Sequence, residues 1–396
     1  MTVGAGEGTS VNRHITPLWL DCDPGHDDAF AILLAAHHPS LRLLGISTVH
    51  GNGSLANTTV NAGSILEAIG RSDIPVHPGA SKPFCRLAVH AVDIHGTSGL
   101  DGTDLLPTPT TPPVINPNAI VAMRDALLSQ PKDTAWLVAT GTLTNIALLF
   151  ATFPEVAGHI RGLSIMGGAI GDKFTDAPMS RLSGEETRVG NTTQWAEFNI
   201  YCDPEAAQSI FSIPILAPKT TLITLDLTHQ VLATPKVQSL ILQAEPAQDG
   251  DISSDPKSTA TILRQILHAL LNFFATTYDT VFGLSAGPPL HDPLAVAVLL
   301  SNLNHPVGGE QKPLLRFDDN DGERFLVNVV IDGQHSRDPL IVGQLGRTVT
   351  TSVPGGKSIG GVAIPRGVDV DAFWNIVQDC LQRADDFNVQ KAKDMD

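Results

Sequence analysis

Short apolar runs alternate with helical patterns over most of the chain. The runs have the length and aliphatic content of strands, and they lie at residues 18–21, 41–49, 74–77, 135–139, 162–165 and 221–225. Helical spacing fills residues 28–37 and 57–69 and resumes near Thr144 and Pro204. Residues 29–36 are apolar on every side, which predicts a buried helix. Apolar strands separated by helices predict an α/β fold: a mostly parallel open sheet with helices on both faces.

The pattern changes in the second half of the chain. Residues 259–280, 292 to about 300, and 370–384 predict helices, and residues 325–331 and 340–342 predict two strands of a small antiparallel extension. Residues 172–189 and 244–258 are polar and predict surface insertions. Because neither a repeat nor a Gly/Ser-rich linker divides the chain, we expect one domain over residues 14–390, preceded by a flexible segment at residues 1–13.

Composition narrows the class of protein. The chain has 396 residues, 42% hydrophobic and 17% charged, which is typical of a globular protein with a substantial core. Its formal charge of −16 argues against nucleic acid as a partner. The sequence has neither an apolar run of the ~18 residues that cross a bilayer nor the apolar core of a signal peptide. The four cysteines have no CxxC spacing. These features predict a cytoplasmic protein with reduced thiols.

The most informative segment is Asp21-Cys-Asp-Pro-Gly-His-Asp-Asp28, at the carboxyl end of the first predicted strand. Ligands bind at that end of open α/β sheets. Four carboxylates this close raise one another's pKa unless a cation balances them, and ligation by oxygen alone favours calcium or magnesium. Two other interpretations are an acidic helix start at Asp27 and Asp28 and an Asp-x-Asp phosphatase. An EF-hand fits poorly, because Ile32 occupies the position of its glutamate.

This segment resembles the DxDPGxDDA signature of the inosine–uridine preferring nucleoside hydrolase family. Further blocks that resemble the family follow in order at residues 49–52, 95–102, 139–145, 166–168, 190–191, 196–199, 203–206 and 291–295. The similarity covers about residues 17–302, and the opening motif looks most like the fungal uridine nucleosidase branch. One departure is Gly141-Thr-Leu143, where the family usually has Gly-Pro-Leu. The resemblance implies the Rossmann-like fold of nucleoside hydrolases.

The resemblance also implies a calcium site and a reaction. The expected ligands are Asp23, Asp28, the backbone carbonyl of Thr140, and Asp292. The expected reaction is hydrolysis of the N-glycosidic bond of a ribonucleoside, which gives free base and ribose through an oxocarbenium-like transition state. Asp23 is the candidate base that activates water, or alternatively a purely structural ligand. Asp21 is expected to orient the loop from behind the ligands.

The remaining candidates surround the substrate. His291, beside a metal ligand, is the candidate general acid for the leaving base. Met166 packs under the sugar or in the core, and Tyr278 lines the base pocket or the core. Glu197 and Asn199 alternate around Phe198, so an extended backbone there would point both the same way. The expected substrate-binding set is Asp27, Asn52, His95, Met166, Asn191, Glu197 and Asn199.

Two questions stay open at the level of sequence. One question is whether the protein is an enzyme at all. The alternative function is that of a catalytically inactive, calcium-dependent protein that binds a nucleoside or ribose. The base preference is also open, although the likeness to uridine nucleosidases favours uridine. The family forms dimers and tetramers, so we expect a homodimer or homotetramer.

Overall fold

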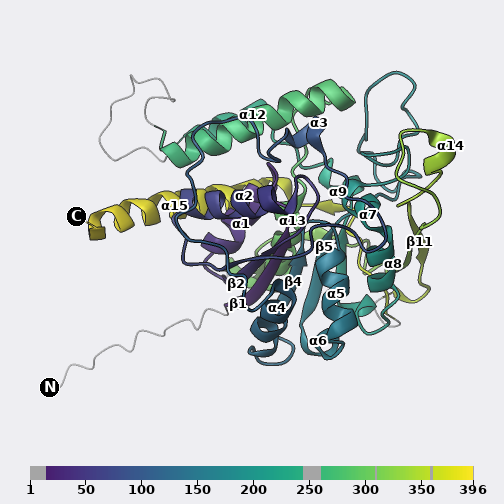
Figure 1. Cartoon of the computed structure of the whole chain (residues 1–396), viewed down its shortest axis with the longest axis horizontal. Coiled ribbons are helices and arrows are strands. Elements are labelled where there is room, and N and C mark those ends of the chain that lie inside the picture. The colour runs from purple at the N-terminus through teal and green to yellow at the C-terminus, as the bar shows by residue number, and fades with distance from the viewer. Residues whose placement is uncertain (1–14, 244–259, 308–309, 357–359, 396) are drawn as a thin grey trace.

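Six parallel strands form the central sheet of the computed structural model, which describes residues 15–243, 260–307, 310–356 and 360–395 (Figure 1). The strand order is β3-β2-β1-β4-β5-β6. The strands are β1 (Thr16–Cys22), β2 (Leu41–Thr48), β3 (Val76–Pro78), β4 (Trp136–Ala139), β5 (Gly162–Met166) and β6 (Thr220–Ile223). The predicted α/β class with a mostly parallel sheet is therefore confirmed.

Side chains alternate across this sheet into two cores. On β1, Leu18 and Leu20 pack into one core, whereas Trp19 between them packs into the other. On β4 the same alternation separates Val138 from Leu137. Both faces are buried because helices cover both, which explains why the strands are continuous apolar runs rather than alternating ones.

Each core is closed by its own layer of helices (Figure 1). The first layer contains α1 (Asp28–His37), α2 (Leu55–Ala68), α10 (Pro235–Leu242), α12 (Ile262–Phe282), α13 (Asp292–Ala297) and α15 (Val370–Met395). The second contains α4 (Ala119–Leu128), α5 (Thr144–Thr152), α6 (Glu155–His159) and α8 (Pro204–Phe211). Short helical turns connect them at α3 (Val92–His95), α7 (Phe198–Cys202), η1 (Ala217–Lys219), α9 (Leu225–Thr228) and η2 (Val298–Asn302).

Among the described residues, three small antiparallel pairs extend the fold. They join β7 (Asn304–Val307) to β8 (Glu310–Pro313), β9 (Phe317–Asp318) to β12 (Gly367–Val368), and β10 (Phe325–Val329) to β11 (Thr348–Ser352). The extension was predicted, but the strand at residues 340–342 was wrong: Pro339–Val342 forms the helical turn α14. Asp338 caps its first turn and proline occupies the first helical position, both of which favour a helix start.

Residues 172–189 contain neither helix nor strand, as expected of an insertion. The expected insertion at 244–258 and the expected flexible segment at 1–13 lie outside the described residues. Within the described part of the chain, none of the helices is both long and apolar enough to span a membrane.

The topology fixes where a ligand can bind. From β1 the sheet grows through β2 on one side and through β4 on the other, so the strand order reverses between β1 and β4. The loops that follow these two strands diverge and leave a crevice at their carboxyl ends. The acidic turn follows β1 and Thr140 follows β4, and the Thr140 amide donates to the carbonyl oxygen of Asp21 at 2.8 Å. This contact holds the two loops together at the crevice.

Candidate active site

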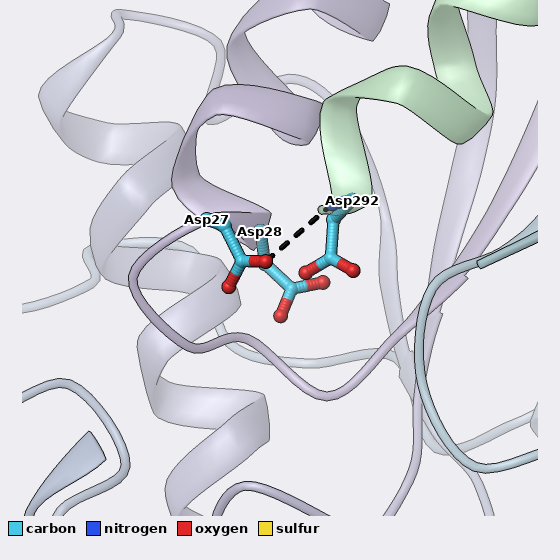
Figure 2. Close-up of side chains that lie close together, drawn as sticks. All are labelled: Asp27, Asp28 and Asp292. Atoms are coloured by element: carbon cyan, nitrogen blue, oxygen red, sulfur yellow. Dashed lines mark hydrogen bonds between the residues drawn. The ribbon is translucent and has the colours of Figure 1, made fainter. Parts of the chain in front are cut away.

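Three carboxylates from two distant parts of the chain converge at the crevice (Figure 2). Oxygen atoms of Asp27, Asp28 and Asp292 lie within 4.8 Å of one another, and all three residues are buried. Asp27 and Asp28 stand at the start of α1, and Asp292 begins α13. The packing of α13 against α1 brings residues 265 positions apart together, and the Asp292 amide donates to Oδ2 of Asp27 at 3.4 Å.

The remaining contacts of Asp28 are to neutral donors. Its Oδ2 accepts from the Gly25 amide at 2.9 Å, and its Oδ1 accepts from the Thr140 hydroxyl at 2.8 Å. The Thr140 carbonyl oxygen, an expected ligand, accepts from Nδ2 of Asn199 at 2.8 Å. These bonds orient oxygen atoms around the crevice but bring no positive charge to it.

Asp23 is not one of the three converging carboxylates. Its Oδ2 accepts from the Asn52 amide at 2.7 Å, whereas its Oδ1 is buried and has no hydrogen-bond partner among the described residues. A buried carboxylate oxygen without a partner is costly, which marks this atom as one that a ligand or water completes. Gly51 and Gly141 stand so close that a Cβ would lie 1.8 Å from Oδ2 and 2.7 Å from Oδ1 of Asp23, respectively.

Asp21 lies behind the crevice. It is completely buried and accepts from the Ser47 hydroxyl and from Nδ2 of Asn145, the latter at 2.8 Å. Burial raises the pKa of Asp21 to about 7. Because its partners lie on β2 and α5, Asp21 ties the end of β1 to its neighbours.

The carboxylates of the site are electrostatically unfavourable as they stand. Burial raises the pKa of Asp28 to about 7 and that of Asp27 to about 6, and the charge of Asp27 raises the pKa of Asp28 further. Burial and the charge of Asp27 also raise the pKa of Asp292 well above its usual value. The residues that line the adjoining pocket include no lysine or arginine within the described ranges.

This donor set fits a hard divalent cation. It offers buried carboxylate and carbonyl oxygens and no thiolate or imidazole within the group of three, which is the chemistry that calcium and magnesium prefer. Asp28 and Asp292 were predicted as ligands. Asp27, expected among the substrate-binding residues, lies with them and also lines the adjoining pocket.

A pocket opens beside the carboxylates. All seven residues expected to bind the substrate line it, and apolar side chains line it as well. The lining residues are Asp27, Asn52, Ala91, Ile94, His95, Thr140, Met166, Asn191, Thr192, Glu197, Phe198, Asn199, Phe274, Tyr278, Phe282, His291 and Asp292. A pocket lined by both polar and apolar side chains is typical of a small-molecule site.

Glu197 and Asn199 reach the pocket, but not from an extended backbone. Phe198 begins α7, and Glu197 is its cap, accepting from the amides of Asn199 at 2.8 Å and Ile200 at 3.0 Å. Glu197 also accepts from the Gly168 amide at 2.9 Å. The prediction of an extended segment was wrong because a capping carboxylate satisfies the free amides of a helix start.

His291 lines the pocket and is hydrogen-bonded at both ring nitrogens. Its Nε2 lies 2.7 Å from the hydroxyl of Tyr278, and its Nδ1 lies 2.7 Å from the hydroxyl of Thr228. Burial holds the pKa of His291 well below its usual value, so the ring is neutral near pH 7. Tyr278 and His291 therefore line the pocket as a hydrogen-bonded pair.

Aromatic residues of α12 form the apolar side of the pocket. Phe274, Tyr278 and Phe282 repeat every four residues, so they share one face of the helix, and all three are buried. Of these, only Tyr278 was predicted from the sequence. The four-residue spacing was the signal that could have indicated the other two.

Three comparisons relate the chain to known proteins: a family model, relatives in sequence and a solved structure. A family model described as "Inosine-uridine preferring nucleoside hydrolase" matches residues 18–375. The chain is 35% identical to uridine nucleosidase of Saccharomyces cerevisiae, over 93% of this chain and 96% of the relative. It is 36% identical to a pyrimidine-specific ribonucleoside hydrolase of Shewanella woodyi, over 84% and 89% of the two chains. The structure of a purine-preferring ribonucleoside hydrolase from Gardnerella vaginalis superposes with a TM-score of 0.70 at 26% identity, covering 93% of this chain and 98% of that one.

Proposed function

Because the chain belongs to the inosine-uridine preferring nucleoside hydrolase family and is a hydrolase of N-glycosyl bonds, we propose that it cleaves ribonucleosides in a calcium-dependent reaction. The observation that carries the proposal is the group of three buried carboxylates, Asp27, Asp28 and Asp292, beside a pocket with an aromatic side. The carboxylates suit a cation and the vicinal hydroxyls of a ribose, and the aromatic side suits a planar base.

We assign the cation to Asp28, Asp292, Asp23 and the carbonyl oxygen of Thr140, with Asp27 at the border with the substrate. When bound, the ion supplies a positive charge that neutralises these carboxylates and acidifies a nearby water molecule. Asp23 accepts the proton of that water at Oδ1, the oxygen without a partner. Its other oxygen is held by the Asn52 amide, so the basic atom keeps a fixed direction.

The polar side of the pocket binds the ribose. Asp27 and Asn52 lie near the cation, and Asn191, Glu197 and Asn199 line the rest of that side. These groups surround the sugar with oxygens, which stabilises the positive charge that develops when the C–N bond breaks. Met166, whose sulfur is 3.5 Å from Nδ2 of Asn199, packs against the sugar.

The leaving base is protonated through Tyr278. Its hydroxyl lines the pocket and is 2.7 Å from Nε2 of His291, so Tyr278 donates the proton, and the Nε2–H of neutral His291 stabilises the phenolate until water returns the proton. In this proposal Tyr278 is the general acid, and His291, the acid expected from the sequence, supports it through this hydrogen bond. Thr228 fixes the far nitrogen of the ring at 2.7 Å.

We further propose uridine as the preferred substrate. The support is similarity at 35% and 36% identity to proteins named as a uridine nucleosidase and a pyrimidine-specific hydrolase. The similarity to a purine-preferring enzyme is lower, at 26%. From the family resemblance we also expect a homodimer or homotetramer that acts in the cytoplasm.

The deciding experiment measures free ribose released from uridine, cytidine, inosine, adenosine and guanosine. Assays run with EDTA, and after calcium or magnesium is added back. We expect release from uridine to be fastest, to be lost in EDTA, and to return with calcium. Asp28→Asn should abolish release, whereas Asp104→Asn, at an exposed aspartate, should leave it unchanged. Nucleoside binding by calorimetry without release of ribose from any substrate would contradict the proposal.

A further inference from the structure

A pair of stacked histidines links the acidic turn to the wall of the pocket. The rings of His26 and His95 lie 5.1 Å apart at 26° to one another, and their Nδ1 atoms are separated by 2.9 Å. Both residues are buried, and His95 lines the pocket. Gly25 permits this approach, because a Cβ there would lie 2.6 Å from Nδ1 of His95. The two nitrogens are therefore hydrogen-bonded, with one proton between them.

The position of that proton follows from the other end of His26. Its Nε2 lies 2.7 Å from the carbonyl oxygen of Asp101. A backbone carbonyl only accepts hydrogen bonds, so Nε2 of His26 must carry a proton. The ring is held in this orientation by parallel stacking on Phe273 and Phe274, at 5.1 and 5.5 Å between centroids.

The tautomer of His26 determines the tautomer of His95. Burial among phenylalanine rings favours neutral imidazoles, so His26, protonated at Nε2, carries a lone pair at Nδ1. Nδ1 of His95 must donate to that lone pair, and a neutral His95 is left with a lone pair at Nε2. The backbone amide of His26 also approaches Nδ1 of His95, but at 3.4 Å this contact is longer than the 2.9 Å bond between the rings. The shorter bond dictates the tautomer.

We propose that His26 is a positioning residue that holds His95 in the tautomer with its proton on Nδ1, so that Nε2 of His95 accepts a hydrogen bond from the bound nucleoside. Within the described chain, no protein group bonds to Nε2 of His95, which leaves this atom for the ligand. The inference rests on the proposed function. It means that the pocket recognises an N–H or O–H of the substrate at this point and repels a carbonyl oxygen.

The test reads the tautomer directly in protein labelled with ¹⁵N-histidine. Long-range ¹H–¹⁵N spectra of calcium-loaded, substrate-free protein distinguish protonated from unprotonated ring nitrogens, and His95→Gln identifies the His95 signals. We expect Nδ1 protonated and Nε2 unprotonated. A native His95 with its proton on Nε2 overturns the inference, even if no variant folds.

Substitution of His26 tests whether this residue sets the tautomer of His95. His26→Phe keeps an aromatic ring against Phe273 but has no nitrogen, so His95 should shift toward the tautomer protonated at Nε2. The KM for uridine should rise about tenfold, with a smaller change in kcat, because one hydrogen bond to the substrate is lost. His26→Asn, which offers an acceptor oxygen near the position of Nδ1, should restore both. An unchanged tautomer in His26→Phe overturns the inference.

Controls separate this effect from damage to the site. His159 lies on α6, in the opposite helix layer, and is hydrogen-bonded to the carbonyl oxygen of Gln130. His159→Phe should therefore alter neither the tautomer of His95 nor the KM for uridine. Calcium affinity, measured by calorimetry, should be equal in native protein and His26→Phe. The spectra use no substrate, so a protein that releases no ribose would contradict the proposed function and leave the tautomer result standing.

Two analogues identify the recognised donor. If the 5′ hydroxyl of the ribose supplies the hydrogen bond, 5′-deoxyuridine should bind equally to native protein and His26→Phe. If the base supplies it, 3-methyluridine should do so. A full effect of His26→Phe with both analogues would mean that neither donor contacts His95, and would overturn the recognition role.

Discussion

Tyr278 lines the pocket and is hydrogen-bonded to His291, and its hydroxyl is the proposed donor of the proton to the base. Tyr278→Phe keeps the ring that packs 4.8 Å from Phe274 but removes that hydroxyl. We expect kcat for uridine to fall by about 100-fold, the usual contribution of general acid catalysis, and KM to change little. Steady-state release of ribose measures both constants.

Two further measurements show whether the lost hydroxyl was an acid. The loss in a Tyr278→Phe, His291→Gln double variant should be far smaller than the product of the two single losses, because both residues serve one proton path. A 4-nitrophenyl riboside, whose leaving group needs no proton, should react at nearly the native rate with Tyr278→Phe. A native kcat for uridine in Tyr278→Phe would mean that the proton comes from elsewhere.

Individual residues differed in how well sequence alone could place them. Asp28 and Asp292 were predicted as neighbours only through the family resemblance, since nothing in a span of 264 residues states that α13 packs on α1. The hydrogen bond between Tyr278 and His291 joins two elements, and the sequence has no signal for it. Residues of one helix face are different, because the four-residue spacing of Phe274, Tyr278 and Phe282 is visible in the sequence.

At the scale of elements, one buried ion pair fixes the long helix α12. Arg264 on α12 and Asp385 on α15 form a 2.6 Å contact, and the side chain of Arg264 is only 1% exposed. Asp385→Ala leaves the arginine buried without its counter-charge. We expect the free energy of unfolding to fall by about 3–5 kcal/mol, measured by urea denaturation. Since α12 carries the aromatic side of the pocket, KM for uridine should also rise.

The matched control is an exposed pair. Arg71 and Asp73 are 2.8 Å apart, but the side chain of Asp73 is 62% exposed. Asp73→Ala should therefore cost at most about 1 kcal/mol. Equal losses of stability in the two variants would contradict the role given to burial.

Elements of the sheet were predictable because their apolar runs are long and are bounded by polar turns. The error at residues 340–342 came from a run of three apolar residues, too short for its period to separate strand from helix. The true partner of β10 is β11, whose Thr348–Ser352 sequence is rich in β-branched residues. Those residues do not form an apolar run, although β-branched residues favour strands.

At the scale of the whole molecule, the site couples metal binding to stability. In unfolded protein the aspartates titrate near 3.8, whereas folded Asp27 and Asp28 titrate at about 6 and 7. Without a cation the folded state binds more protons between these values, so this contribution to stability is lost as pH rises through 6 and 7. The proposed calcium ion would bind the deprotonated carboxylates and reverse the loss.

We therefore expect the gain in Tm on adding calcium to grow from pH 5 to pH 8. Scanning fluorimetry with calcium and with EDTA measures the gain at each pH. The buried histidines titrate in both samples, so they cancel to first order in the difference. In Asp28→Asn the gain should be small at every pH. A gain in native protein that is equal at pH 5 and pH 8 would contradict the assignment of these carboxylates to the cation.

The overall architecture was accessible from sequence because one rule connects chain order to site position. Parallel strands with helical crossovers put all strand ends on one edge, and a reversal of strand order opens a crevice there. The first strand lies at that reversal, so its acidic turn had to lie at the crevice. The internal arrangement of the pocket did not follow from this rule, because it depends on loops and on α12.

The close approach of Gly51 and Gly141 to Asp23 has a consequence for how the protein tolerates variation. Both positions border the carboxylate with backbone alone, and even one methyl group would collide with it. A saturation library should therefore record these two glycines as intolerant as the aspartates, although neither has a functional group. Ranking positions by tolerance would mistake them for reactive residues. A second-site change that shortens or turns Asp23 cannot rescue them, since the clash and the chemistry concern the same oxygens.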